Sequence, residues 1–66
     1  MSQSSTVMAF RKRLRSWGYS QISITQKMDG NDMKIRGLYV VKAVEPLAGT
    51  PVEVEYSLER MRLSFR

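Results

Sequence analysis

The sequence contains no cysteine and no histidine, and both absences narrow what a chain of 66 residues can be. A disulfide is excluded, and a structural zinc site lacks its usual thiolate and imidazole ligands. Acid–base catalysis lacks its commonest side chain, and nucleophilic catalysis lacks the thiol. Because no glycine-rich stretch ends in Gly-Lys-Ser or Gly-Lys-Thr, the chain has no P-loop. We therefore expect a protein that is not an enzyme and that holds no cofactor and no metal ion.

Long apolar runs are also missing. No stretch approaches the roughly 20 apolar residues of a membrane-spanning helix, and residues 1–6 lack the basic and then apolar order of a secretory signal. We expect a cytoplasmic protein that does not enter a membrane. A chain of this length forms one domain, residues 1–66, and buries only about 60% of its unfolded surface. Small folds usually need a disulfide, a metal or a partner subunit, and self-association is what remains here, so the sequence predicts a homodimer.

Positive charge is what the sequence has in excess, with a formal net charge of +5. Residues 1–36 hold seven Lys and Arg against two Asp, whereas residues 37–66 hold four charges of each sign. The whole excess therefore lies in the first half. Such an asymmetry favours a polyanionic partner, with nucleic acid ahead of an anionic membrane surface. A solvated basic surface without a partner is the alternative.

An amphipathic helix is predicted over residues 5–17, after a short flexible tail at residues 1–5. Four apolar residues recur at helical spacing and share one face, which predicts that they pack in the core: Val7, Phe10, Leu14 and Trp17. Gly18 follows directly and is typical of a helix C-cap. Four basic residues flank the apolar face: Arg11, Lys12, Arg13 and Arg15.

After the helix the apolar residues recur at every second position, which is typical of β-strands. The sequence Asp29-Gly30-Asn31-Asp32 is a strong turn signal and predicts a hairpin that folds about Gly30–Asn31. The predicted register pairs Met28 with Met33 and Gln26 with Ile35. In this register three cations share the outer face of the two-stranded ribbon: Lys27, Lys34 and Arg36.

The second half predicts further strands and leaves one element open. Residues 38–44 form an apolar run that suits a buried strand or a short helix, and periodicity does not decide between them. Alternating apolar residues at 52–56 and 61–65 predict a second hairpin. In that hairpin Arg62 lies opposite Glu55, which removes this arginine from the candidates for ligand binding. The predicted fold is α+β, with an N-terminal amphipathic helix followed by a small antiparallel sheet of about four strands in two hairpins.

Clustered cations are the strongest functional signal in the sequence. Residues 11–15 hold four of them and resemble a phosphate-binding patch, and a two-stranded ribbon can enter a major groove. We expect a nucleic-acid-binding protein, with DNA favoured over RNA, that acts as a regulator or accessory protein of a phage, plasmid or other mobile element. The alternative is a protein-interaction module or inhibitor that docks on a larger protein. The predicted binding residues are Arg11, Lys12, Arg13, Arg15, Lys27, Lys34 and Arg36.

Residues 33–65 carry a family resemblance in three segments: Met33-Lys34-Ile35-Arg36-Gly37 with Tyr39, Gly49-Thr50-Pro51-Val52-Glu53-Val54-Glu55-Tyr56, and Met61-Arg62-Leu63-Ser64-Phe65. They are similar to SymE-like toxins of the AbrB/MazE swapped-hairpin superfamily. The chain departs from that pattern at residues 43–46 and 57–60, where the family has an Ala-Gly-Phe-like helix end and a glycine turn. The resemblance implies a short helix around Tyr39, a last strand at 61–65 and an intertwined homodimer that binds DNA or RNA, with Lys34 and Arg36 among the contacts.

Overall fold

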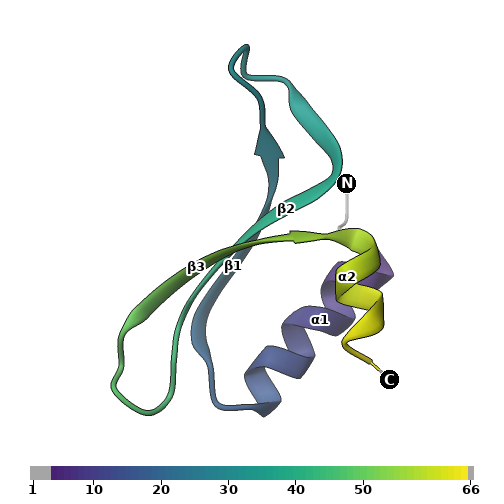
Figure 1. Cartoon of the computed structure of the whole chain (residues 1–66). Coiled ribbons are helices and arrows are strands. Elements are labelled where there is room, and N and C mark those ends of the chain that lie inside the picture. Colours follow the sequence, from purple (N-terminus) through teal and green to yellow (C-terminus); the bar gives the residue numbers. More distant parts are fainter. Residues whose placement is uncertain (1–3, 66) are drawn as a thin grey trace.

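The computed structural model describes residues 4–65. The elements follow in the order α1 (Ser5–Ser16), β1 (Ser20–Met28), β2 (Lys34–Val44), β3 (Pro51–Ser57) and α2 (Leu58–Leu63). The strands form one antiparallel sheet in the order β1-β2-β3, which confirms an α+β fold. Both helices pack on one side of the strongly twisted sheet, and the β1–β2 hairpin projects beyond them (Figure 1). Within residues 4–65, no helix is long and apolar enough to cross a membrane.

Helix α1 confirms the helix predicted over residues 5–17. The hydroxyl of Ser4 accepts a hydrogen bond from the N–H of Val7 at 3.2 Å, which caps the first turn. At the other end Gly18 adopts a left-handed φ of +95°, and a Cβ placed there would lie 3.0 Å from the Cβ of Pro46. Glycine is therefore required both for the backbone turn and for the contact with the β2–β3 loop. Residues 1–3 of the predicted tail lie outside the described residues, whereas Ser4 and Ser5 begin the helix.

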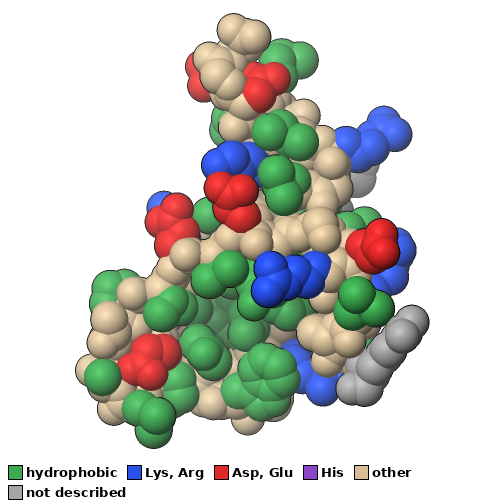
Figure 2. Space-filling model, in the orientation of Figure 1, with side chains coloured by type: hydrophobic (Ala, Val, Ile, Leu, Met, Phe, Trp, Pro, Cys, Tyr) green, Lys and Arg blue, Asp and Glu red, His purple; other side chains and the backbone are tan. Residues whose placement is uncertain are grey.

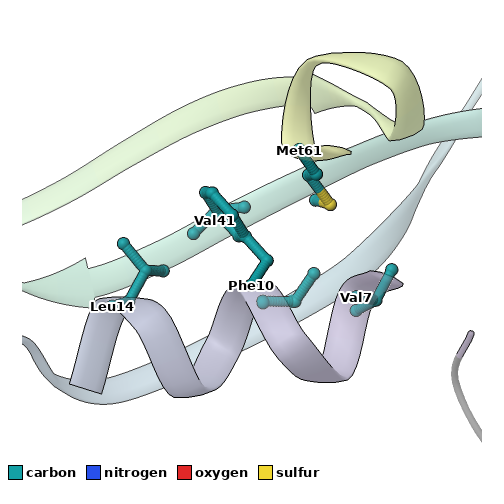
Figure 3. Packing of buried hydrophobic residues seen from close by; sticks show 6 residues of the cluster. Val7, Phe10, Leu14, Val41 and Met61 are labelled. Carbon is teal, nitrogen blue, oxygen red and sulfur yellow. The ribbon is translucent and has the colours of Figure 1, made fainter. Parts of the chain in front are cut away.

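The core is small and lies between α1, the sheet and α2. Figure 3 shows Phe10 and Leu14 on the α1 side of the core, close to Val41 of β2, while Met61 enters from α2. The rings of Phe10 and Tyr56 lie 5.0 Å apart between centroids. The buried apolar side chains come from every element except β3: Val7, Phe10, Leu14, Ile24, Val41, Ala43 and Met61.

The prediction that Trp17 packs in the core is wrong. Its spacing from Leu14 predicts burial, yet its side chain is 52% exposed. The reason is that α1 ends at Ser16, and Trp17 is the C-cap residue, with a φ of −87° and a ψ of 2°. Beyond the last helical turn the side chain leaves the apolar face and lies beside Arg13, whose guanidinium carbon is 6.0 Å from the ring centroid.

Residues 38–44, for which the sequence did not decide between strand and helix, form a strand as part of β2. The predicted register of the first hairpin is wrong, because Gln26 lies opposite Tyr39 and not Ile35. The ladder breaks between Gln26 and Met28, where β2 contributes extra residues that include Gly37 with a φ of +76°. A left-handed glycine in such a bulge lets the strand take up additional residues without losing the pairing on either side. Gln26 still reaches Ile35, since its side-chain amide donates to the carbonyl of Ile35 at 3.0 Å.

The second predicted hairpin is wrong. Residues 58–63 form helix α2, so the described sheet has three strands and not about four. Two local interactions start this helix: the hydroxyl of Ser57 accepts from the N–H of Arg60 at 3.1 Å, and Glu59 lies in the first turn. An acidic side chain near a helix N-terminus is favourable because of the helix dipole. Arg62 therefore does not lie opposite Glu55 in a ladder.

Glu45 organises the loop between β2 and β3. Its carboxylate accepts hydrogen bonds from the N–H of Ala48 and, at 3.3 Å, from that of Leu47. Its own N–H donates to the carbonyl of Thr50 at 3.0 Å. The hydrogen bond from Ala48 is the largest cause that lowers the pKa of Glu45 from its ordinary value of 4.5. A negative carboxylate is thus part of the loop structure at neutral pH.

This loop should respond to acid. A carboxyl group whose pKa is lowered on folding stabilises the fold above its unfolded pKa, and that contribution is lost as the pH falls through the folded pKa. In a titration followed by NMR, we expect the amide resonances of Leu47 and Ala48 to shift with a midpoint below 4.5. The Glu45→Gln variant should lack that transition. A wild-type midpoint at or above the ordinary value would contradict this account of the loop.

Candidate nucleic-acid interface

The four predicted cations of α1 fall into two kinds. Arg11 and Arg13 are half-buried, whereas Lys12 and Arg15 are exposed. The Arg11 guanidinium donates to the carbonyl of Ile22 on β1 at 3.5 Å. Arg13 lies on the other flank of the helix, with its guanidinium carbon 5.0 Å from the ring centroid of Phe65. Both arginines therefore take part in the packing of α1 against its neighbours.

Lys12 and Arg15 point away from these contacts. No described residue forms a hydrogen bond or ion pair with the side chain of either one. Arg15 also lies in the last turn of α1, where a cation interacts favourably with the negative end of the helix dipole by about 0.3–1 kcal/mol. That interaction leaves the guanidinium exposed, so Arg15 can stabilise its helix and still contact a phosphate.

The three cations predicted on the outer face of the first hairpin also differ in whether they are paired with an acidic residue. The Nζ of Lys27 lies 2.6 Å from Oε2 of Glu55, so this lysine pairs with β3 across the intervening strand β2. Lys34 and Arg36 are exposed, and neither has an ion-pair partner in the described part of the chain. They lie at the beginning of β2, directly after the hairpin turn.

The outer face of the sheet carries charges of both signs. Besides the Lys27–Glu55 pair, Lys42 lies directly opposite Glu53 in the β2–β3 ladder. Opposite charges in neighbouring positions cancel much of the field that would attract a polyanion. This face is therefore a poorer phosphate-binding surface than the exposed cations of α1 and the hairpin.

Cations of the second half also reach the surface. Arg62 is exposed, and the reason for excluding it, a pairing with Glu55, does not hold because Glu55 pairs with Lys27. Arg60 lies over the ring of Tyr56, with its guanidinium carbon 5.1 Å from the centroid. The Ser57 cap followed by Glu59 was the sequence signal that could have revealed the helix carrying both arginines.

Four of the predicted residues share three properties, and we call them the exposed basic set. Each is exposed, comes from the basic first half of the chain, and forms no described ion pair: Lys12, Arg15, Lys34 and Arg36. Arg11, Arg13 and Lys27 instead have structural contacts. No protein-family model, curated protein or solved structure matches this chain. The functional argument consequently rests on the charges and their placement.

Proposed function

We propose that the protein binds nucleic acid through the exposed basic set, as a regulator or accessory protein in the cytoplasm. The observation that supports this most is that these four cations keep their charge at the surface while other cations of the first half are used in packing or pairing. Lys and Arg contacts to phosphates supply most of the sequence-independent affinity of such proteins. We propose no enzymatic role, because the sequence has no histidine and no cysteine for acid–base or nucleophilic chemistry.

DNA is the favoured partner because of the shape of the first hairpin. The β1–β2 hairpin projects beyond the helices as a two-stranded ribbon (Figure 1), and the major groove of B-form DNA is about 12 Å wide and admits such a ribbon. The major groove of an RNA duplex is too narrow for this. Asp29 and Asp32 place negative charge at the turn. We therefore expect the stem, with Lys34 and Arg36, to approach the phosphates, and the turn to stay away from them.

The resemblance to SymE-like toxins stays a prediction. It implies a helix around Tyr39, where the chain forms β2, and a strand at 61–65, where residues 61–63 form the second half of α2. Lys34 and Arg36, which the resemblance names as contacts, belong to the exposed basic set on independent grounds. The proposal of nucleic-acid binding therefore does not depend on that relationship.

Neutralising the exposed basic set should abolish binding. We expect the wild type to bind generic duplex DNA with micromolar affinity in about 50 mM salt, and the slope of log K against log salt to be about −3.6 for four phosphate contacts. The variant Lys12→Gln, Arg15→Gln, Lys34→Gln, Arg36→Gln should show no shift in the same gel assay. Its loss of charge leaves the buried core untouched.

A control variant removes three charges elsewhere: Lys27→Gln, Lys42→Gln and Arg62→Gln. It should retain most of the wild-type affinity, because these residues lie on the balanced outer face or on α2. Equal loss of binding in the two variants would mean that net charge alone is responsible. A wild type that binds neither duplex nor single-stranded nucleic acid in about 50 mM salt would contradict the proposal and leave the protein-interaction role.

A further inference from the structure

An apolar hollow lies on the helix side of the sheet, in the part that neither helix covers. It is lined by Leu14, Tyr19, Val41, Ala43, Val52, Val54 and Tyr56. At one end Pro46 packs against Gly18, beside Tyr19. Figure 2 shows hydrophobic side chains gathered around this hollow, between the β2–β3 hairpin and α1. Val54 is 42% exposed and Trp17, next to Gly18, is 52% exposed. The hollow is thus an unfinished part of the core.

The exposed area of the chain is larger than a compact monomer needs. Its accessible surface is 5008 Å², whereas the scaling law for folded monomers of 7.6 kDa gives about 4,300 Å². The exposed area thus exceeds that of a compact monomer by about 700 Å². A standard protein interface buries about 800 Å² on each partner. An interface of that size, centred on the hollow and including the surface around it, would bring the exposed area to that of a compact fold.

The two ends of the hollow carry opposite charges. The Glu45 carboxylate lies in the β2–β3 loop, next to Pro46. At the other end Arg60 lies over Tyr56, which lines the hollow. A two-fold axis brings the same surface of two copies together in opposite directions. The acidic end of one copy then meets the basic end of the other, so this surface is complementary to itself.

The free edge of β3 is a poorer surface for association. Strand β3 pairs with β2 on one side only, and its outer-face residues include Glu53 and Glu55. Antiparallel pairing of two β3 strands about Val54 would place Glu53 of one copy opposite Glu55 of the other. Like charges in directly opposite positions destabilise a sheet. Association through the apolar hollow avoids this repulsion.

We propose that a second copy of this chain covers the hollow and forms a two-fold dimer, in which Val54 is buried and Glu45 of one protomer faces Arg60 of its partner. The dimer completes the apolar core that one chain of this length leaves open. Leu47, which is 94% exposed in the β2–β3 loop, lies at the rim of the contact. The surface is separate from the exposed basic set, so the dimer and the binding of nucleic acid are tested independently.

Sedimentation velocity of the full chain, without nucleic acid, tests this dimer. We expect the wild type to sediment as a dimer at high micromolar concentration. The Val54→Asp variant should be monomeric with an unchanged far-UV circular dichroism spectrum, because a carboxylate in the contact would lose its water without gaining a partner. Met33→Asp is the matched control: Met33 is 64% exposed beside the hairpin turn, far from the hollow in the chain, and this variant should remain a dimer.

Leu47→Asp provides a second variant if Val54→Asp does not fold, since the Leu47 side chain is almost fully exposed and its replacement cannot disturb the core. It should raise the dissociation constant at least tenfold. A folded wild type that stays monomeric at high micromolar concentration would overturn the dimer. Equal dimerisation of the Asp variants at positions 54, 47 and 33 would also overturn it, because the contact would then lie elsewhere.

Discussion

The Met61→Ala variant should be less stable than the wild type by about 2–5 kcal/mol, the range for truncating a fully buried methionine or leucine to alanine. Met61 has no exposed surface and enters the core from α2, opposite α1. Truncating it removes contacts with both helices and the sheet and leaves a cavity. Since a domain of this size has only about 3–10 kcal/mol of total stability, the variant should unfold at a much lower urea concentration, as followed by far-UV circular dichroism.

Leu63→Ala is the matched comparison for Met61→Ala. Leu63 is 48% exposed at the end of α2, so its truncation should change the free energy of unfolding by no more than about 0.5 kcal/mol. In the hairpin that the alternation predicts, Met61 and Leu63 would share one face, and truncating either to alanine would lower the free energy of unfolding by a similar amount. Comparable destabilisation by the two substitutions would therefore contradict helix α2.

The Phe10→Ala variant should lose about 3–5 kcal/mol of stability, as is usual for a buried phenylalanine. Phe10 is buried at the centre of α1 and its ring contacts that of Tyr56 from β3. The substitution therefore weakens the attachment of α1 to the sheet. Urea unfolding followed by far-UV circular dichroism should show a midpoint at a much lower urea concentration than that of the wild type.

Trp17→Ala is the control for Phe10→Ala, because the two residues share one stripe in the sequence and differ in burial. With its side chain half exposed at the C-cap, Trp17 should contribute less than about 1 kcal/mol to the fold of one chain. The comparison is made at low micromolar concentration, where association does not add to the measured stability. A loss as large as that of Phe10→Ala would show that Trp17 belongs to the core of the single chain.

Local signals in the sequence account for the parts of the fold that were predicted. The apolar stripe of Val7, Phe10 and Leu14 and the following Gly18 are sufficient for α1. Alternation is sufficient to place strands in β1, β3 and the first residues of β2, whereas it left residues 38–44 open between strand and helix. The register of the first hairpin was not predictable, because the bulge at Gly37 depends on how β2 continues beyond the turn. For residues 58–63 the alternation of apolar residues gave the wrong prediction. A short apolar pattern does not distinguish one turn of helix from two residues of strand.

The sequence was sufficient to list the candidate cations. It was not sufficient to show which of them lie exposed and unpaired on the surface. Which cations stay free depends on contacts between residues far apart in the sequence. Lys27 and Glu55 are 28 positions apart and meet only because β2 lies between their strands. Arg13 similarly reaches Phe65 near the other end of the chain. Neither partner can be chosen from composition or periodicity, so the narrowing to Lys12, Arg15, Lys34 and Arg36 required the fold.

The close approach of Gly18 and Pro46 has a consequence for how the chain folds. Because the end of α1 and the β2–β3 loop pack against each other, we expect neither to hold its final conformation without the other. Helix and hairpin therefore gain their stability together, as expected of a cooperative two-state domain. We expect no stable intermediate in which α1 alone, or the sheet alone, is formed.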